Sequence, residues 1–457
     1  MKFETFQLSD LFIKGEGNLH VVVLNNRSGQ VYRFPKESKK GVQIYENIDV
    51  ENLDLKKLYK ITINYKKYDV LQKFWGKEYL PKMKSEAHCD LQRVCLFPKQ
   101  IIEQIAAYLE SHRLESRRNK SIITKTSFIE IQPDLSLLPV EYNMFTNGVT
   151  YCVELKPKFG LLFHFNNHNS GDCRNIMSRF CIGQFKKADK TNYCPCDIFS
   201  GNSMRMSRAI KSLIQKPQEK LRIFENGLLV SDINNSVISR MVEHLFPGSH
   251  SSETESVEKF CNLVIQALMY DVSNNKQWLE LPYDVSTSCQ AHLWSKDKDT
   301  NNNNNSSSFP QIYADSVLGR LAMTSCLVDH RTEDLVELYS KLESFLTKHG
   351  IEMKENIFDL WNEHLLPLEL PEEIIQIVHI LKKFLVSLTV RDCSILIKFK
   401  KACVDKLNVK QTNASILKQS DGSIILNMSD IIDISIKPLS KIKSNYQYEQ
   451  ELLKIFQ

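Results

Sequence analysis

An apolar segment that ends in Lys-Pro-Lys places the strongest limit on how this chain can fold. Residues Tyr151–Leu155 have the composition of a buried strand, and Lys156, Pro157 and Lys158 follow directly. Pro157 removes a backbone donor and restricts φ, and lysine ammonium groups stay at the surface while their stems are buried. The strand therefore ends at the surface, and the two lysine side chains beside Pro157 can point in only a few directions. A site for a multiply charged anion and a simple solvated strand end both fit this pattern.

Three other basic segments lie at Ser178–Phe180, Gln184–Lys187 and, far away in sequence, Lys437–Lys441. The last begins with Lys437-Pro438, so it repeats the Lys-Pro pattern at a second strand end. Two distant strand ends of this kind favour one shared site for a compact anion. Lysine binds phosphate as a point charge, so the arrangement of several lysines has to provide selectivity.

Length and charge bound the class of protein. The 457 residues allow two or three domains, and 42% hydrophobic and 25% charged residues are ordinary for a globular chain. The formal charge of +5 and the pI near 8.4 are mild, whereas a nucleic-acid-binding domain usually lies above about pI 9. We therefore expect no specific nucleic-acid partner, with RNA binding as an alternative that the basic segments leave open.

The cysteines and the N-terminus indicate a reduced compartment. Twelve cysteines are scattered along the chain, and Cys152, Cys261 and Cys393 lie in apolar segments, where a free thiol behaves as a small hydrophobe. Met1–Thr5 lacks the apolar stretch of a signal peptide, and no apolar stretch approaches about 18 residues. We expect a monomeric cytoplasmic or nuclear protein with no membrane span.

The order of the expected elements indicates a mixed α+β fold. A turn at Asn25–Gly29 predicts a hairpin, and Lys99–Ser111 has helical periodicity. Beyond Gly201 helices dominate, and the end returns to strands. The expected strands are 19–24, 30–34, 58–63, 127–131, 149–155, 384–399 with a break at 391–392, 423–427 and 431–436. The later expected helices are 204–214, 257–270, 315–327, 333–349, 372–388 and 445–456.

Two polar segments interrupt the helical region. Ser251–Ser256 has the composition of a short polar loop, and residues 296–308 contain an Asn and Ser tract with no apolar residue to bury. We expect both segments to be disordered insertions between helices.

A glycine-containing turn, Gly15-Glu16-Gly17-Asn18, precedes the first expected strand. Glycines at such a turn let backbone N–H groups approach a phosphate, as in the glycine-rich loops of kinases. Arg33 lies on the returning strand of the same hairpin, where its guanidinium would be beneath the loop. A plain turn and a solvated strand arginine explain the same residues.

Two aspartates interrupt apolar runs near the C-terminus. Asp392 lies within Leu388–Ile395, and Asp433 lies within Ile431–Ile436. A carboxylate inside a β-rich apolar run is costly unless it is paired, bound to a metal or catalytic. Phosphoryl transfer needs one carboxylate that accepts the hydroxyl proton and one that holds Mg²⁺. Aspartates that cap turns are the alternative.

Several motifs are absent from the sequence. The chain has no GxxxxGK[ST] phosphate loop and no dinucleotide fingerprint, which disfavours P-loop and Rossmann proteins. It has no His-Arg-Asp or Asp-Phe-Gly, so it is no ordinary protein kinase. It also has no CxxC pair, and Cys194-Pro195-Cys196 is too close for a structural zinc site.

Taken together, the motifs resemble the inositol-pentakisphosphate 2-kinase family. The matching segments, in the order and rough spacing of that family, are Gly15–Asn18, Val31–Arg33, Val153–Gly160, Ser178–Phe180, Tyr193–Gly201, Pro217–Gly227, Arg391–Ile395 and Asp433–Leu439. The resemblance extends from Gly15 to Lys441. Residues from about 232 to 380 are not matched.

The resemblance implies a two-lobed fold distantly like that of protein kinases. A β-rich N-lobe would cover residues 1–138, and a larger mixed C-lobe over 139–457 would carry a helical inositol-phosphate-binding region. The implied reaction is ATP- and Mg²⁺-dependent phosphorylation of the 2-hydroxyl of inositol 1,3,4,5,6-pentakisphosphate, giving inositol hexakisphosphate (phytic acid). A non-catalytic inositol-phosphate-binding scaffold on the same fold is the alternative.

The resemblance also assigns roles to residues. Asp392 would be the general base and Asp433 the Mg²⁺ ligand. The implied ATP contacts are Gly15, Glu16, Gly17, Asn18, Arg33 and Glu154. The implied substrate contacts are Lys156, Lys158, Lys187, Lys437, Lys441 and one arginine that is either Arg117 or Arg118. Five phosphates carry a charge of about −8 to −10 at neutral pH, which suits this lysine-rich set.

The chain departs from the family pattern at three positions. Lys441 replaces an arginine, which keeps the charge but loses a bidentate fork. Gln184 follows Gly183 where relatives carry a His-Gln pair, and Cys196 stands where leucine is usual. The zinc site of some relatives has no evident ligands in this sequence.

Overall fold

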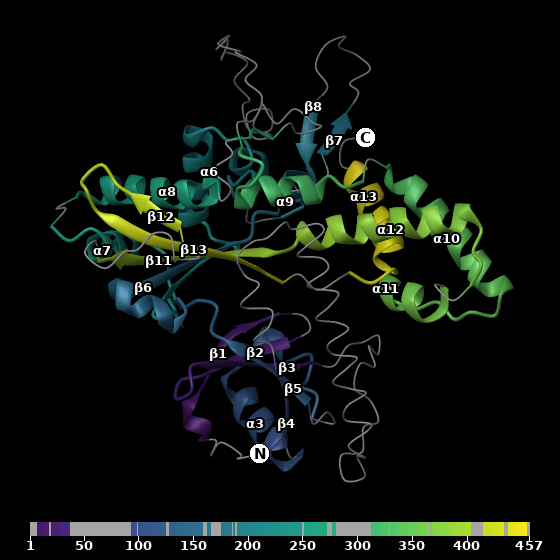
Figure 1. Ribbon diagram of the computed structural model, residues 1–457, viewed down its shortest axis with the longest axis horizontal. Coiled ribbons are helices and arrows are strands. Elements are labelled where there is room, and N and C mark those ends of the chain that lie inside the picture. The colour runs from purple at the N-terminus through teal and green to yellow at the C-terminus, as the bar shows by residue number, and fades with distance from the viewer. Residues whose placement is uncertain are drawn as a thin grey trace. The chain divides into compact units, whose positions relative to one another are not determined.

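The structure is a computed structural model that describes most of the chain (Figure 1). The described residues are 7–17, 20–36, 93–97, 99–124, 128–158, 162–165, 175–184, 186–187, 190–248, 251–271, 277–279, 312–328, 330–365, 368–403, 415–433 and 437–454. The expected strand 58–63, Asn18 and the tract 296–308 lie outside these residues.

The chain divides into two compact units. The first comprises residues 1–137 and 225–229, and the second comprises 138–224 and 230–457. The fold is mixed α+β, with an antiparallel sheet near the N-terminus and a later region of helices and strands. The fold class expected from the order of the elements is therefore confirmed at this level.

The first unit is built on a five-stranded antiparallel sheet with strand order β1-β2-β3-β5-β4. The strands are β1 (Leu11–Glu16), β2 (His20–Asn25), β3 (Gln30–Pro35), β4 (Arg93–Leu96) and β5 (Phe128–Pro133). The shorter elements are η1 (Leu8–Asp10), η3 (Glu115–Arg117) and β10 (Leu228–Leu229).

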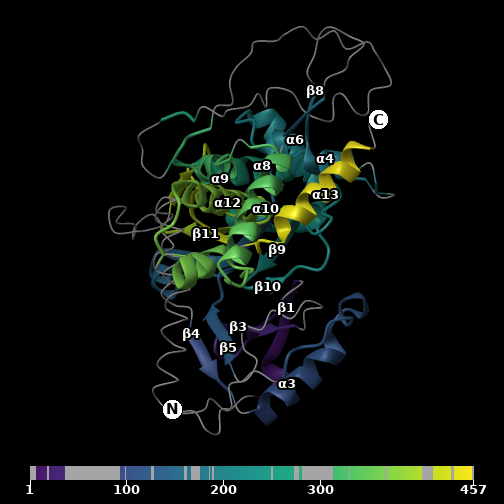
Figure 2. The ribbon, with the colours of Figure 1, turned by 90° about the vertical axis from the view of Figure 1, so that its right-hand side faces the viewer.

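Helix α3 (Lys99–His112) lies beside this sheet (Figure 2) and matches the helix that the sequence predicts. Its buried Ile102, Ile105 and Leu109 share one hydrophobic core with Val23 of β2. Residues three or four apart lie on one face of a helix, which is why this spacing buries them together.

The hairpin predicted at Asn25–Gly29 is confirmed between β2 and β3. The side chain of Asn25 accepts hydrogen bonds from the backbone N–H groups of Arg27 at 3.0 Å and Ser28 at 3.2 Å. Gly29 has a φ of +66°, which glycine adopts without a steric penalty.

The turn predicted before β2 is in part a strand, because Gly15 and Glu16 belong to β1. The register shifts between Ile13 and Gly15, which leaves Lys14 as the extra residue of a β-bulge. The bulge aims Lys14, which forms an ion pair with Asp134 and donates to Ser136 Oγ at 2.6 Å. A glycine inside a strand often marks such a bulge.

Strand pairing places Arg33 in register with Gly15. Gly15 is opposite Val22, and Val22 is opposite Arg33. The three residues therefore form one cross-strand row across β1, β2 and β3. The backbone of Arg33 is therefore aligned with the strand end that leads to Gly17.

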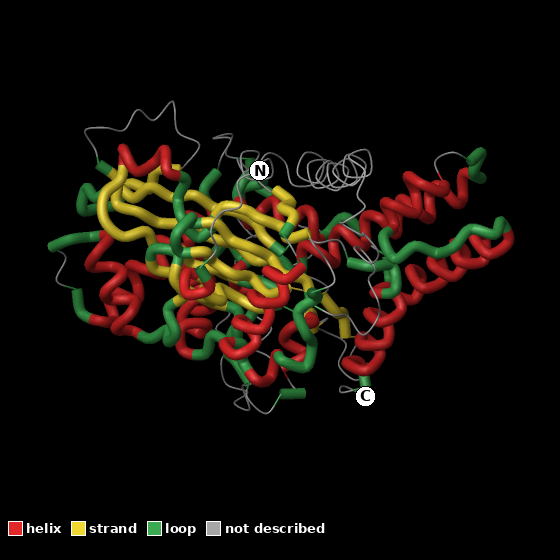
Figure 3. Tube along the Cα trace, turned by 90° about the horizontal axis from the view of Figure 1, so that it is seen from below, coloured by secondary structure: helices red, strands yellow, loops and turns green. Residues whose placement is uncertain are grey.

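The second unit contains a larger sheet with strand order β9-β6-β11-β13-β12, continued by β10 beyond β9. The strands of this sheet are among those drawn in yellow in Figure 3. They are β6 (Thr146–Leu155), β9 (Leu221–Glu225), β11 (Ser394–Ala402), β12 (Ser415–Lys418) and β13 (Ile424–Ile432). A separate antiparallel pair consists of β7 (Leu162–Phe165) and β8 (Asn175–Ser178).

The helices of the second unit lie along this sheet and beyond one end of it (Figure 1). They are α4 (Arg179–Gln184), α5 (Pro195–Ile198), α6 (Ser203–Gln215), α7 (Asn235–Leu245), α8 (Glu253–Met269), α9 (Val317–Ser325), α10 (Thr332–Lys348), α11 (Ile357–Asp359), α12 (Glu372–Val390) and α13 (Lys441–Leu453). A 3₁₀-helix, η4 (Val140–Phe145), and a π-helical turn, η5 (Leu360–Leu365), complete the set. Helix α7 contacts β6 and β11, and α8 contacts β12 and β13.

Two expectations about the C-terminal strands are wrong. Residues 384–390 are the last turns of α12, because its buried face continues through Phe384 and Leu385 to Val390. This packing outweighs the strand propensity of the β-branched residues. Residues 424–427 and 431–432 belong to one strand, β13, because Met428, Ser429 and Asp430 between them also pair with β11.

The polar segment 251–256 is also not a disordered loop. Ser252 caps α8, accepting from the backbone N–H of Glu255 at 3.3 Å, while the Glu255 side chain accepts from the Ser252 N–H at 2.8 Å. This reciprocal pair is the Ser-x-x-Glu capping box, which satisfies two backbone donors at the start of a helix.

Two further expectations agree with the described part of the chain. Cys152, Cys261 and Cys393 are buried free thiols. Among the helices that the structure describes, none is long and apolar enough to cross a membrane.

Lys398 of β11 and Asp430 of β13 form an ion pair within the sheet, with side-chain exposures of 0% and 3%. Replacing Lys398 by Met should lower the free energy of unfolding by about 3–5 kcal/mol, because Asp430 would remain buried without its cation. Chemical denaturation would measure this loss. In the double variant with Asp430→Asn most of the stability should return, and equal losses in both variants would contradict the explanation.

Candidate active site

Four chain segments meet at one end of the larger sheet. Leu155, the last residue of β6, is opposite Ile395 of β11, and Ser394 is opposite Ile432, the last residue of β13. In an antiparallel pair, the residues before one strand and the residues after its neighbour lie at the same end of the sheet. Lys156 follows β6, and its N–H donates to the carbonyl of Lys220 just before β9 at 2.8 Å.

Asp392 and the two Lys-Pro segments come together at this edge. Lys158 forms an ion pair with Asp392 Oδ1, and Lys437 Nζ lies 2.8 Å from Asp392 Oδ2. Lys158 and Lys437 are far apart in sequence, yet one carboxylate binds both. The two Lys-Pro segments therefore lie together around Asp392.

Asp392 lies in the turn between α12 and β11, where its N–H donates to the carbonyl of Thr389 at 2.9 Å. Burial raises the pKa of the carboxyl, but the ammonium groups of Lys158 and Lys437 lower it further, and the net pKa is far below the ordinary value. Asp392 is thus ionised and serves as the counter-ion of two lysines.

Asp433 and Glu154 share one hydroxyl group. Ser394 Oγ lies 2.9 Å from Glu154 Oε1 and 3.3 Å from Asp433 Oδ2. Lys156 Nζ lies 3.0 Å from Asp433 Oδ2. Burial lowers the pKa of Lys156, but Asp433 and Glu154 raise it, with a net increase. The Lys156 ammonium group is therefore charged at neutral pH.

Asp433 has an unusual backbone conformation, with a φ of +62° at the end of β13. Aspartate tolerates this left-handed region better than most residues. The turn leaves the carboxylate 45% exposed, so a cation could reach it from solvent. A residue with two carboxylate oxygens at a partly open position has the donor chemistry that Mg²⁺ prefers.

Backbone contacts fix the Lys156-Pro157-Lys158 segment. The hydroxyl of Tyr193, which is fully buried, donates to the carbonyl of Pro157 at 2.6 Å. Lys158 has a φ of +52°, a conformation that costs free energy for a residue with a Cβ and is retained only where its surroundings enforce it. The surrounding protein therefore holds this segment in place. A loosely solvated strand end was the alternative interpretation of the sequence.

The sequence predictions missed Lys220, which directly precedes β9. Burial lowers its pKa to about 8, and the charges of Lys158, Lys187 and Lys156 contribute, while Glu219 opposes the shift. The hydrogen bond from the Lys156 N–H holds Lys220 beside the Lys-Pro-Lys segment, and the charge of Lys187 also acts on Lys220. We refer to Lys156, Lys158, Lys187, Lys220 and Lys437 as the lysine cluster.

Lys441, Arg117 and Arg118 are the remaining residues that were expected to contact the substrate. Lys441 is an exposed first residue of α13. In the first unit, Arg118 donates to the carbonyls of Arg113 at 3.1 Å and Ser111 at 3.2 Å, so it caps the C-terminal end of α3. Arg117 is partly buried at the end of η3.

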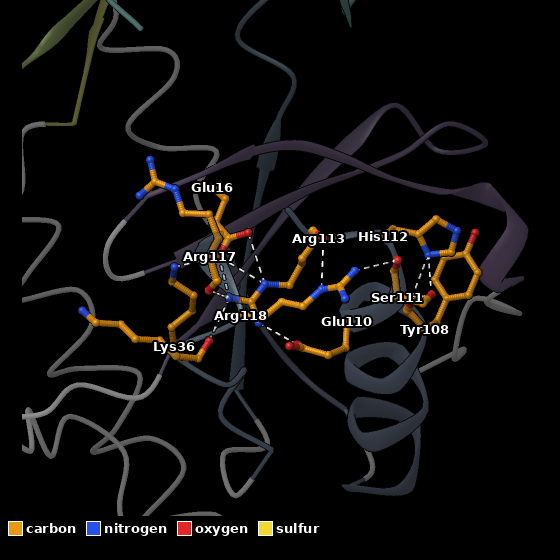
Figure 4. Close-up of polar contacts among 10 residues, drawn as sticks. Glu16, Lys36, Tyr108, Glu110, Ser111, His112, Arg113, Arg117 and Arg118 are labelled. Carbon is orange, nitrogen blue, oxygen red and sulfur yellow. Dashed lines mark hydrogen bonds and ion pairs between the residues drawn. The ribbon is translucent and has the colours of Figure 1, made fainter. Parts of the chain in front are cut away.

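The side chain of Glu16 is bound inside the first unit. Its carboxylate forms ion pairs with Lys36 at 2.7 Å and Arg113 at 2.6 Å (Figure 4). Burial raises the pKa of Glu16, but Arg113 and Lys36 lower it further, so it stays ionised. A charged carboxylate repels phosphate, and these contacts make Glu16 an anchor at the base of the glycine turn.

A metal site made by protein side chains alone is not found among the described residues, where no three His, Cys, Asp or Glu side chains group suitably. Asp433 with Glu154 is a smaller set. It fits Mg²⁺, which usually binds one or two carboxylates and completes its shell with water and phosphate oxygens.

Comparison with known proteins gives a consistent result. A family model described as inositol-pentakisphosphate 2-kinase matches residues 14–451. The chain is 24% identical to an inositol-pentakisphosphate 2-kinase of Danio rerio over 100% of this chain and 95% of the relative. It is 22% identical to one of Arabidopsis thaliana over the same shares. A similar kinase of Oryza sativa subsp. japonica is 24% identical over 72% of this chain and 66% of the relative.

The position of Lys220 predicts a pH-dependent affinity for polyanions. Above pH 8 the free protein loses the Lys220 proton, and a bound phosphate group has to restore it, so affinity should fall by up to about tenfold per pH unit. Titration calorimetry with inositol hexakisphosphate between pH 7 and 9.5 would measure this. In Lys220→Arg, which stays charged, the slope should vanish. A slope that persists in this variant would contradict the assignment.

Proposed function

The chain belongs to the inositol-pentakisphosphate 2-kinase family, and from that premise we propose that its lysine cluster holds the phosphates of the inositol ring. The protein is an inositol-pentakisphosphate 2-kinase: with ATP as phosphoryl donor it converts inositol pentakisphosphate to inositol hexakisphosphate. The roles of individual residues in this reaction are our proposal.

The proposal rests on one observation above all. Lys158 and Lys437, both next to a proline and far apart in sequence, bind the same carboxylate of Asp392. When the substrate enters, its phosphates compete for these ammonium groups. Each charge-assisted contact is worth about 1.5–3 kcal/mol, so several contacts together offset the loss of the internal ion pairs.

Asp392 is the proposed general base. It accepts the proton of the 2-hydroxyl while that oxygen forms its bond to the γ-phosphorus of ATP and the bond to the ADP oxygen breaks. In the free protein its pKa is held low by Lys158 and Lys437. As these lysines turn to substrate phosphates, the pKa of Asp392 rises and the carboxylate becomes a better proton acceptor.

Asp433 is the proposed ligand for Mg²⁺, with Glu154 beside it near the nucleotide. Their shared contact with Ser394 and the partial exposure of Asp433 support this assignment. When bound, Mg²⁺ would neutralise charge on the ATP phosphates. Lys156, which pairs with Asp433, is then available for a substrate phosphate.

In the first unit, we assign ATP phosphates to the backbone of Gly15–Asn18 and to Arg33. The register that aligns Gly15 with Arg33 supports this assignment. Of the two candidate arginines we choose Arg117 for the substrate, because Arg118 caps α3. Residues 1–138 and 139–457 would be the two lobes, and Lys441 would be a peripheral substrate contact. The buried free thiols are consistent with a cytoplasmic or nuclear location.

Replacing Asp392 by Asn should lower kcat by a factor of about 10²–10⁴, because the amide cannot accept the proton. Binding of inositol pentakisphosphate should persist, since Lys158 and Lys437 are then released from their counter-ion. Product formation from ATP, Mg²⁺ and inositol 1,3,4,5,6-pentakisphosphate, followed by ion-exchange chromatography, would measure this.

The matched control is Asp421→Asn, which changes an exposed turn aspartate and should leave kcat unchanged. An Asp392→Asn enzyme with normal turnover would remove Asp392 from the mechanism. A wild-type protein that binds the pentakisphosphate tightly but forms no hexakisphosphate would instead support the non-catalytic scaffold.

Replacing Asp433 by Asn should weaken the Mg²⁺-dependent part of nucleotide binding. We expect the ratio of the ATP-analogue Kd values without and with Mg²⁺ to fall at least about tenfold, since a charged ligand to the cation is lost. Calorimetry with a non-hydrolysable analogue would measure both values. An unchanged ratio would show that Asp433 does not serve the metal.

A further inference from the structure

Arg113, which directly follows α3, uses its whole guanidinium group inside the first unit (Figure 4). Its side chain is 0% exposed. Nε lies 3.1 Å from both carboxylate oxygens of Glu16, and Nη2 lies 2.6 Å from Glu16 Oε1. Nη1 lies 2.6 Å from Glu110 Oε2. The group therefore joins β1 to the end of α3.

The same guanidinium also binds backbone carbonyl groups of the segment that follows. Nη2 donates to the carbonyl of Arg117 at 2.5 Å and to that of Lys120 at 2.8 Å. Both carbonyls belong to the turn from which the Arg117 side chain extends. Arg113 thus fixes the backbone that carries the arginine assigned to the substrate.

At its other end the network reaches the nucleotide turn. Glu16 is the last residue of β1 and precedes Gly17. Lys36 Nζ donates to Glu16 Oε1 at 2.7 Å, the oxygen that Arg113 Nη2 also contacts. The backbone of Lys36 pairs with that of Ile122, which is just beyond Lys120. Glu16 and Glu110 balance the charges of Arg113 and Lys36, so the set is neutral, with Glu110 on its solvent-exposed side.

From these contacts we propose that Arg113 is a positioning residue that couples ATP binding at the Gly15–Asn18 turn to inositol-phosphate binding at Arg117. The inference rests on the proposed function of both sites. A guanidinium is a rigid planar fork, so Glu16 cannot move without disturbing the donors that hold the Arg117 carbonyl. A buried donor left unpaired is costly. Both ligands therefore favour the same arrangement, and the coupling is reciprocal.

The test measures the coupling itself in the full-length protein. The Kd of a non-hydrolysable ATP analogue with Mg²⁺ is determined without and with saturating inositol hexakisphosphate, and the ratio of the two values is the coupling factor. We expect the wild-type factor to be at least about fivefold. In Arg113→Lys it should fall to near one, because lysine keeps the charge for Glu16 but cannot bridge to both carbonyls.

Arg27→Lys is the matched control, because it makes the same change at an exposed residue of the β2–β3 turn and should keep the wild-type factor. Glu16→Gln breaks the network from its other end and should also give a factor near one. The double variant Arg113→Lys with Glu16→Gln should lose nothing more. If Arg113→Lys does not fold, Glu16→Gln carries the test.

A purely structural role for Arg113 would lower the melting temperature or both affinities and leave the ratio unchanged. An unchanged factor in a folded Arg113→Lys or Glu16→Gln protein overturns the proposal, as does a wild-type factor of one. Failure of the proposed function has a different result, because then the wild-type protein would not bind the inositol phosphate or would form no product.

Discussion

The ion pairs of Asp392 with Lys158 and Lys437 are the contacts on which the rest of the site depends. They join the end of β6, the turn between α12 and β11 and the segment before α13. Antiparallel pairing and backbone contacts bring these segments together, and the opposite charges hold the lysine side chains at the carboxylate. Without the carboxylate, the lysines would repel one another across a partly buried surface.

The sequence alone was enough to select those residues of the candidate site that interrupt a regular apolar pattern. Lys156-Pro157-Lys158, Asp392 and Asp433 all break apolar runs, and a break of this kind is visible without coordinates. Lys220 and Arg113 interrupt nothing, because each lies in an ordinary polar turn. Their importance comes from contacts with distant residues, and a linear pattern does not encode such contacts.

The same distinction explains which elements of the fold were predicted. Helices such as α3 form where periodic apolar residues meet a sheet, so composition and spacing suffice. Tertiary contacts instead determine the last turns of α12 and the middle of β13. The end of α12 stays helical because its buried face continues. The middle of β13 stays in the sheet, where Asp430 pairs with Lys398. Local propensity is a weak guide where such packing decides. The Ser-x-x-Glu motif of the capping box at Ser252 is visible in the sequence. The polar composition of the same residues is also typical of a loop, and a loop was predicted there.

The two ion pairs of Asp392 have a consequence for the hydrolysis of ATP by water. Under its proposed role, this acid is a poor proton acceptor for as long as two ammonium groups neutralise it. A water molecule near bound ATP brings no phosphates that could draw those groups away, whereas the inositol ring brings five. Under this proposal, the charge of the true acceptor would itself limit idle hydrolysis of the nucleotide.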